Sequence, residues 1–79
     1  MLIYNVLEHN KRFDSYSITP FIVFDEQLEE VVKEECEVFF KEILKNWGID
    51  VSKRLMEYYV NLGFESDQYT VKIIKSYFN

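Results

Sequence analysis

The stretch from Asp25 to Trp47 constrains the fold more than any other part of this chain, because it carries a complete helix signature. Asp25 is a favourable N-cap residue, and the glutamates that follow it suit the positive end of a helix dipole. Gly48 is a natural stop directly after the stretch. The sequence therefore predicts one long helix with a broad buried face. Its centre is expected at Leu28, Val32, Phe39 and Ile43, widened by Val31, Cys36, Phe40 and Trp47.

The residues before this helix read as two extended segments joined by a turn, which predicts a β-hairpin. Residues 2–8 are rich in β-formers, and a second extended stretch runs from Phe13 to Phe24. Pro20 cannot donate to a ladder, so the second strand is interrupted there or lies at a sheet edge. Apolar residues of one parity predict which face of this strand is buried. That face carries Tyr16, Ile18, Ile22 and Phe24.

Two further elements are expected after Gly48. Asp50 is a suitable N-cap for a second helix that ends near Leu62, with Gly63 as its C′ residue. The last segment, 69–78, is rich in β-branched and aromatic residues, and we favour a strand there over a third helix. Such a strand would complete a sheet that two strands alone could hardly sustain. The apolar side of the second helix is expected to carry Val51, Leu55, Tyr58, Tyr59 and Leu62.

The length and composition indicate one small globular domain that spans residues 1–79. Hydrophobic residues make up 48% of the 79-residue chain and aromatic residues 18%, which argues against disorder. The expected fold class is α+β: an N-terminal β-hairpin, a long acidic helix, a second helix and a C-terminal strand in two layers. The aromatic surplus also suggests that some surface closes only against a second chain.

The residues that usually carry catalysis or bind metals are scarce. His9 is the only histidine and Cys36 the only cysteine, and they fall on different elements, so no zinc spacing exists. The acidic stretch lacks the pattern of a calcium loop, and there is no glycine-rich phosphate loop. Cys36 lies between Glu35 and Glu37, whose charges should raise its thiol pKa, so it reads as a small buried hydrophobe. We therefore expect no enzyme activity, no metal and no cofactor.

The chain carries no signal-peptide pattern and no apolar run long enough to span a bilayer. A soluble, cytoplasmic protein without membrane contact is the expectation. The sequence has no alanine and is rich in Lys, Ile, Asn, Tyr and Phe. This bias is typical of an AT-rich gene, common among phages, mobile elements and AT-rich cells, and a phage or mobile-element origin is the expectation.

The negative charge is concentrated at the start of the expected long helix. The segment from Asp25 to Glu37 holds seven carboxylates and one lysine, a net charge of −6, whereas the whole chain has −5. On a helical projection several of these acids form one exposed row. This is typical of a solvated helix face, which ion pairs between residues four apart can stabilise. The exposed row consists of Glu26, Glu30, Glu34 and Glu37, and the expected ion pairs are Glu29–Lys33 and Glu37–Lys41.

Glu35 and Glu42 do not belong to this row of acids, because they lie at the edge of the apolar arc, beside Val31, Val38 and Phe39. Acids that flank a hydrophobic strip are typical of an interface rim that meets basic residues of a partner. The alternative, which we favour slightly, is internal pairing. The available cations are Lys11, Arg12, Lys72 and Lys75.

Together these features suggest a non-catalytic protein-binding module, such as a small acidic inhibitor or accessory protein that engages a basic surface of a partner protein. Its carboxylates could imitate a nucleic acid. A homo-oligomeric structural or regulatory protein, for example a homodimer, is the alternative. Direct nucleic-acid binding is opposed by the net charge of −5. The candidate partner-binding residues are Glu30, Glu34, Glu35, Glu37 and Glu42, with Trp47 and Tyr59 as aromatic anchors.

Overall fold

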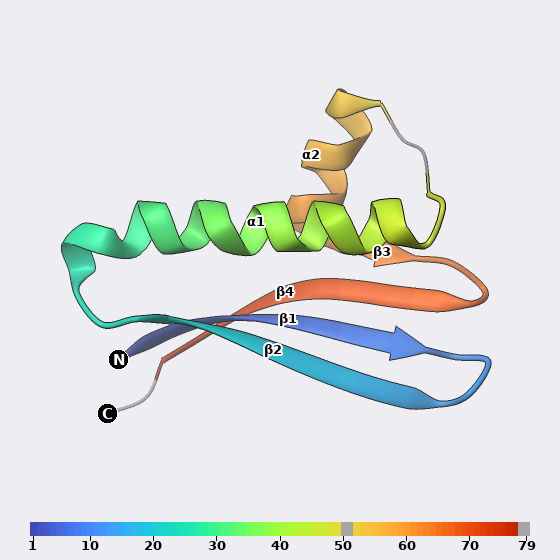
Figure 1. The fold of residues 1–79 in the computed structure, drawn as a ribbon, viewed down its shortest axis with the longest axis horizontal. Helices are drawn as coiled ribbons and strands as arrows, with labels where there is room; N and C mark the ends of the chain where they lie inside the picture. The colour runs from blue at the N-terminus through green and yellow to red at the C-terminus, as the bar shows by residue number, and fades with distance from the viewer. Residues whose placement is uncertain (50–51, 78–79) are drawn as a thin grey trace.

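The computed structural model describes residues 1–49 and 52–77. Within these residues the chain forms a four-stranded antiparallel sheet with two α-helices on one of its faces (Figure 1). The expected α+β class is confirmed, and the last segment is a strand and not a helix. The strands are β1 (Leu2–Asn10), β2 (Ser15–Val23), β3 (Phe64–Glu65) and β4 (Tyr69–Tyr77), and the helices are the 3₁₀ turn η1 (Glu26–Leu28), α1 (Glu29–Asn46) and α2 (Lys53–Leu62).

Strand β1 lies at the centre of the sheet, whose order is β2-β1-β4-β3. It pairs along its whole length with both neighbours, so that Leu2 faces Val23 on β2 and Tyr77 on β4. The side chain of Asn10 supports the predicted hairpin turn by accepting from the backbone N–H of Arg12 at 3.1 Å. The N-terminal hairpin and the C-terminal strand therefore form one continuous sheet.

The register decides which side chains of β2 meet the helices. Tyr4 pairs with Phe21 and Leu2 with Val23, and these side chains face α1, where the Phe21 ring lies 5.5 Å from that of Phe39. Because side chains alternate along a strand, the other parity points to the opposite face. The expectation that this other parity is buried was wrong. Tyr16, Ile18, Ile22 and Phe24 are 64%, 63%, 36% and 79% exposed.

The long helix ends where its local signals predict, and the predicted cap Asp25 caps the 3₁₀ turn η1 that leads directly into α1. The Asp25 carboxylate accepts from the backbone N–H of Gln27 at 2.9 Å, and Gly48 follows the C-terminus with φ of 74°. The predicted buried face is only partly right. Leu28 and Val31 are about half exposed, because the sheet lies against the other side of α1. The residues that α1 buries are Cys36, Phe40, Ile43 and Leu44.

The second helix is capped by Ser52, whose hydroxyl accepts from the backbone N–H of Leu55 at 3.3 Å. The expected cap Asp50 and the neighbouring Val51 lie outside the described residues. Gly63 ends the helix as predicted, with φ of 88° and its N–H on the carbonyl of Tyr59 at 2.7 Å. The expected apolar side of α2 is largely open, since most of it points away from the sheet. Leu55, Tyr58 and Leu62 are 47%, 57% and 65% exposed.

The core lies between α1 and the central strands. Its fully buried side chains come from β1, β4 and α1. Their packing holds the helix against the sheet. No helix among the described residues is both long enough and apolar enough to cross a membrane. The largest fully buried side chains are Phe40, Leu44, Val6, Val71 and Cys36.

Candidate functional site

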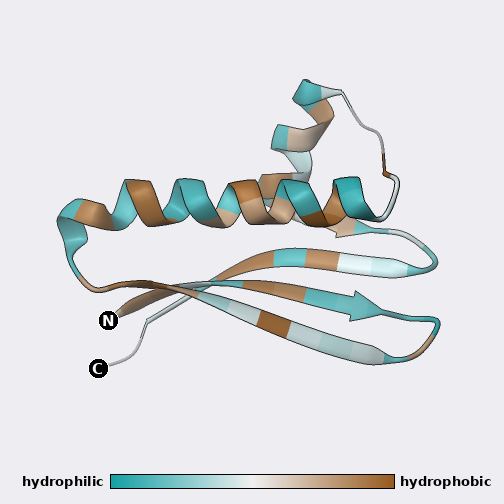
Figure 2. Cartoon of the chain, viewed as in Figure 1, coloured by the Kyte–Doolittle hydropathy of each residue, from teal (hydrophilic) through white to brown (hydrophobic). Residues whose placement is uncertain are grey.

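A row of exposed side chains on the outer side of α1 is the first candidate site. Its residues follow one another at spacings of three and four, so they share one face of the helix, and from Val31 to Glu42 apolar and acidic residues alternate. In Figure 2 hydrophobic and hydrophilic segments alternate along α1. Val31 and Val38 are 53% and 50% exposed, although valine is a residue that proteins usually bury. We call this row the α1 stripe: Leu28, Val31, Glu35, Val38 and Glu42.

The centre of the α1 stripe is slightly hollowed. Val31, Glu34, Glu35 and Val38 line an open depression of about 320 Å³. Two valines and two glutamates line it, so apolar groups and carboxylates lie side by side. A lysine or arginine side chain suits such a surface, because its aliphatic stem can lie on apolar groups while its charged head meets a carboxylate.

The internal ion pairs that were expected for these acids do not form. Neither Glu35 nor Glu42 makes an ion pair with any residue that the structure describes. The cations expected to meet them lie elsewhere: Lys11 pairs with Glu65 at 3.3 Å, and Lys75 lies 3.9 Å from Glu29. The helical pairs Glu29–Lys33 and Glu37–Lys41 are likewise absent from the described part of the chain.

The remaining predicted acids do not form one surface. Glu30 and Glu34 are exposed, but Glu37 is half-buried and turns toward α2. There it lines two small hollows together with Val60 and Asn61. The structure thus separates Glu37 from the α1 stripe, and it places Glu34 beside Val31 and Val38.

The two predicted aromatic anchors pack against the core. The Trp47 ring stacks on Tyr69 with centroids 4.0 Å apart, and the Tyr59 ring meets Phe64 edge-on at 5.1 Å. Both are half-buried, and of the Tyr58–Tyr59 pair it is Tyr58 that is exposed. Their role as partner anchors stays a prediction, whereas their packing already accounts for the aromatic side chains.

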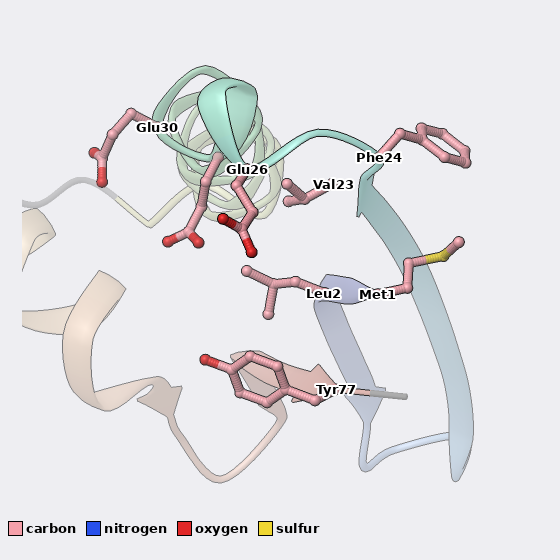
Figure 3. A pocket seen from close by; sticks show the side chains of 8 residues that line it. Met1, Leu2, Val23, Phe24, Glu26, Glu30 and Tyr77 are labelled. Atoms are coloured by element: carbon pink, nitrogen blue, oxygen red, sulfur yellow. The ribbon is translucent and has the colours of Figure 1, made fainter. Parts of the chain in front are cut away.

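A pocket of about 610 Å³ opens where α1 begins (Figure 3). It combines carboxylates at the helix start with aromatic and apolar side chains from the start of β1, the end of β2 and the end of β4. Carboxylates and aromatic rings together suit a cationic group. No pattern in the sequence predicts this pocket, since its walls meet only through the pairing of β1 with β2 and β4. The lining residues are Met1, Leu2, Val23, Phe24, Glu26, Glu29, Glu30 and Tyr77.

Glu29 is fixed by neighbours from two strands. The Tyr4 hydroxyl donates to Glu29 Oε2 at 3.1 Å, and Lys75 Nζ lies over the rings of Tyr4 and Tyr77 at 5.6 and 5.4 Å. Burial, and then the hydrogen bond with Glu29, raises the pKa of Tyr4. The pKa of the Lys75 ammonium is also raised, chiefly by its interaction with the Tyr77 hydroxyl. Glu29 therefore has a structural role that Glu26 and Glu30 do not share.

The other perturbed groups offer no reactive centre. Burial, with a smaller contribution from the charge of Glu37, raises the pKa of the Cys36 thiol to about 11. The side chain lies in the core, so the expected burial of Cys36 is confirmed. Burial also raises the pKa of Glu8. Among the described residues no group of His, Cys, Asp and Glu side chains is arranged to hold a metal ion.

Comparison of the chain with known protein families, curated proteins and solved structures gives no match.

Proposed function

We propose that this protein is a non-catalytic protein-binding module whose helix α1 engages a basic surface of a partner protein. The observation that carries the proposal is the α1 stripe, where Glu35 and Glu42 lie unpaired within the described structure beside the exposed Val31 and Val38. A helix that only needed solubility would have polar residues at the two valine positions.

The chemistry of the α1 stripe suits a protein surface with both apolar and basic character. The exposed valines offer an apolar centre from which a partner would exclude water, and the carboxylates around them would form the polar rim of the interface. The net charge of −6 between Asp25 and Glu37 would speed the encounter with a basic partner at low salt. The pocket at the start of α1 provides a second place for a lysine or arginine, next to Glu26 and Glu30.

The spacing of the acids favours a protein partner over strict imitation of a nucleic acid. Glu35 and Glu42 are seven residues apart, which is about 10 Å along a helix. Phosphates follow one another at about 3.4 Å per strand along duplex DNA. An inhibitor or accessory factor from a phage or mobile element fits such a small acidic module, and its target would be a protein with a basic binding face.

The experiment is quantitative affinity capture from the native cell lysate with the full chain as bait. The bait is compared with Glu35→Lys/Glu42→Lys and with the matched control Glu57→Lys/Asp67→Lys, which changes the net charge equally at exposed positions outside the α1 stripe. We expect one or more basic proteins to be captured by the wild type and the control and to be at least tenfold depleted with the stripe variant. Nuclease treatment identifies contacts that are bridged by nucleic acid.

Equal capture by all three baits would remove the α1 stripe from the function. Loss of capture with both variants would show that bulk charge, and not this surface, attracts the partner. Circular dichroism and thermal unfolding of each bait check that the substitutions leave the fold unchanged.

A further inference from the structure

We propose that a second copy of this chain covers the sheet face that the helices leave open, so that the protein is a face-to-face homodimer. Both helices lie on the same side of the sheet (Figure 1), so the described domain has two layers. No described element packs on the other side. We call this side the open sheet face, and its apolar centre is Ile3, Leu7, Ile18, Pro20, Ile22 and Ile74.

The sequence of β2 is patterned to bury the open sheet face. An antiparallel sheet with one solvated face normally alternates apolar residues toward the core with polar residues toward water. In β2 the alternation is reversed over its first half: Ser15, Ser17 and Thr19 share the helix side, and Tyr16 and Ile18 point to the open side. The side that reads as buried in the sequence is therefore the side that one chain leaves exposed.

The apolar side chains of the open sheet face are contiguous. The register places Ile3 beside Ile22 and Leu7 beside Ile18, and it places Ile74 on the far side of Asn5 from Pro20. Ile3 is only 8% exposed, since its neighbours already cover it, while Ile18 and Ile74 remain 63% and 45% exposed. The patch thus has a packed centre and accessible apolar flanks, which a facing surface would bury.

The charge of the open sheet face suits an identical face better than a basic partner. Among the open-face residues of β1, β2 and β4, Lys72 alone carries a formal charge when histidine is neutral. Two such faces can meet without opposing rows of like charge. By contrast, two α1 helices would bring together two segments of net charge −6, so a dimer through the helices would repel itself.

The size of the open sheet face is close to what a specific dimer needs. A nine-residue strand is about 30 Å long, and three strands side by side are about 14 Å wide, which gives a flat footprint of about 400 Å² per copy. The accessible area over the side chains is larger than the flat footprint. Two copies therefore reach roughly the 1,000 Å² at which specific interfaces begin, and a dissociation constant in the micromolar range is expected.

This dimer uses a surface distinct from the α1 stripe. Stacked sheets lie about 10 Å apart and turn their outer layers away from each other. Both copies of α1 would face outward, and both stripes would remain free to bind the basic partner. The dimer therefore does not depend on the proposed function, and either can fail alone.

The test is the mass of the full chain in solution between 1 and 300 μM, measured by sedimentation equilibrium. We expect a concentration-dependent rise toward twice the chain mass of 9.6 kDa. Ile18→Lys/Ile74→Lys should raise the dissociation constant at least tenfold, because it places charges on the buried face of each copy. The matched control is Val31→Lys/Val38→Lys, which makes the same change at similarly exposed valines of the α1 stripe and should leave the dimer intact.

A wild-type chain that stays monomeric at 300 μM would overturn the proposal. A dimer that survives the open-face substitutions, or one that is lost only with the α1 substitutions, would overturn it equally. If circular dichroism shows that the lysine variant does not fold, Ile18→Thr/Ile74→Thr takes its place. That pair keeps β-branched residues in the strands and should still weaken the dimer several-fold.

Discussion

The Tyr4 hydroxyl donates a hydrogen bond to Glu29 Oε2 at 3.1 Å, and so joins the central strand to the first turn of α1. Removing this hydroxyl should loosen the helix start, which carries both the pocket at the start of α1 and the beginning of the α1 stripe. We expect Tyr4→Phe to lower the free energy of unfolding by about 1–2 kcal/mol, since the bond goes to a carboxylate. Tyr58→Phe removes an exposed hydroxyl and should cost less than about 0.5 kcal/mol. Urea unfolding of both variants measures the difference, and equal costs would contradict the structural role of Glu29.

The buried thiol predicts how stability depends on alkaline pH. The pKa of Cys36 rises from an ordinary 9.0 to about 11 on folding, so the folded protein keeps a proton that the unfolded chain releases. The contribution of the protonated Cys36 thiol to the free energy of unfolding is therefore complete below about pH 9 and is lost as the pH approaches 11. The stability advantage of the wild type over Cys36→Ala should shrink between pH 8 and pH 10.5. Urea unfolding of both proteins at the two pH values checks this, and a constant difference would show that the thiol does not titrate differently in the folded state.

Gly63 is the residue at which substitution should harm the fold most for the least change in size. Its φ of 88° and ψ of 158° lie in a region that glycine alone adopts freely, and a Cβ there would lie 2.9 Å from Cγ of Lys72. We expect Gly63→Ala to destabilise the protein by about 2–3 kcal/mol. Gly48→Ala is the control, because φ is also positive there but no atom lies within 4 Å of the added Cβ. It should cost about 1 kcal/mol, and a larger cost than at Gly63 in thermal unfolding would contradict this account.

Local signals in the sequence predict where helices and strands begin and end, whereas the long-range pairing of strands decides which face of each strand is buried. Asp25 acts through its carboxylate, and Gly48 and Gly63 act through their positive φ angles, so the ends of the helices could be inferred from single residues. The face of β2 that is buried could not be inferred in this way, because both faces of that strand carry apolar residues. Only the pairing of Leu2 with Val23 selects the side that meets α1.

The candidate sites divide in the same way. Helical spacing alone identified Glu35 and Glu42 as acids beside an apolar strip, and the structure leaves them exposed. Helical spacing could not reveal that Val31 faces solvent, because the exposure of Val31 depends on how α1 lies on the sheet. The pocket at the start of α1 was not predictable either, since Tyr77 and Glu26 line the same pocket only after β4 pairs with β1.

Site-specific photo-crosslinking tests the central claim, that the α1 stripe binds a partner, most directly. A photoreactive phenylalanine analogue replaces Val38 on the α1 stripe or, as a control, the exposed Tyr58 on α2. After irradiation in the native cell, we predict a covalent adduct between position 38 and a basic protein, at a yield at least tenfold higher than from position 58. No adduct with another protein from position 38, or equal yields from the two positions, would contradict the account.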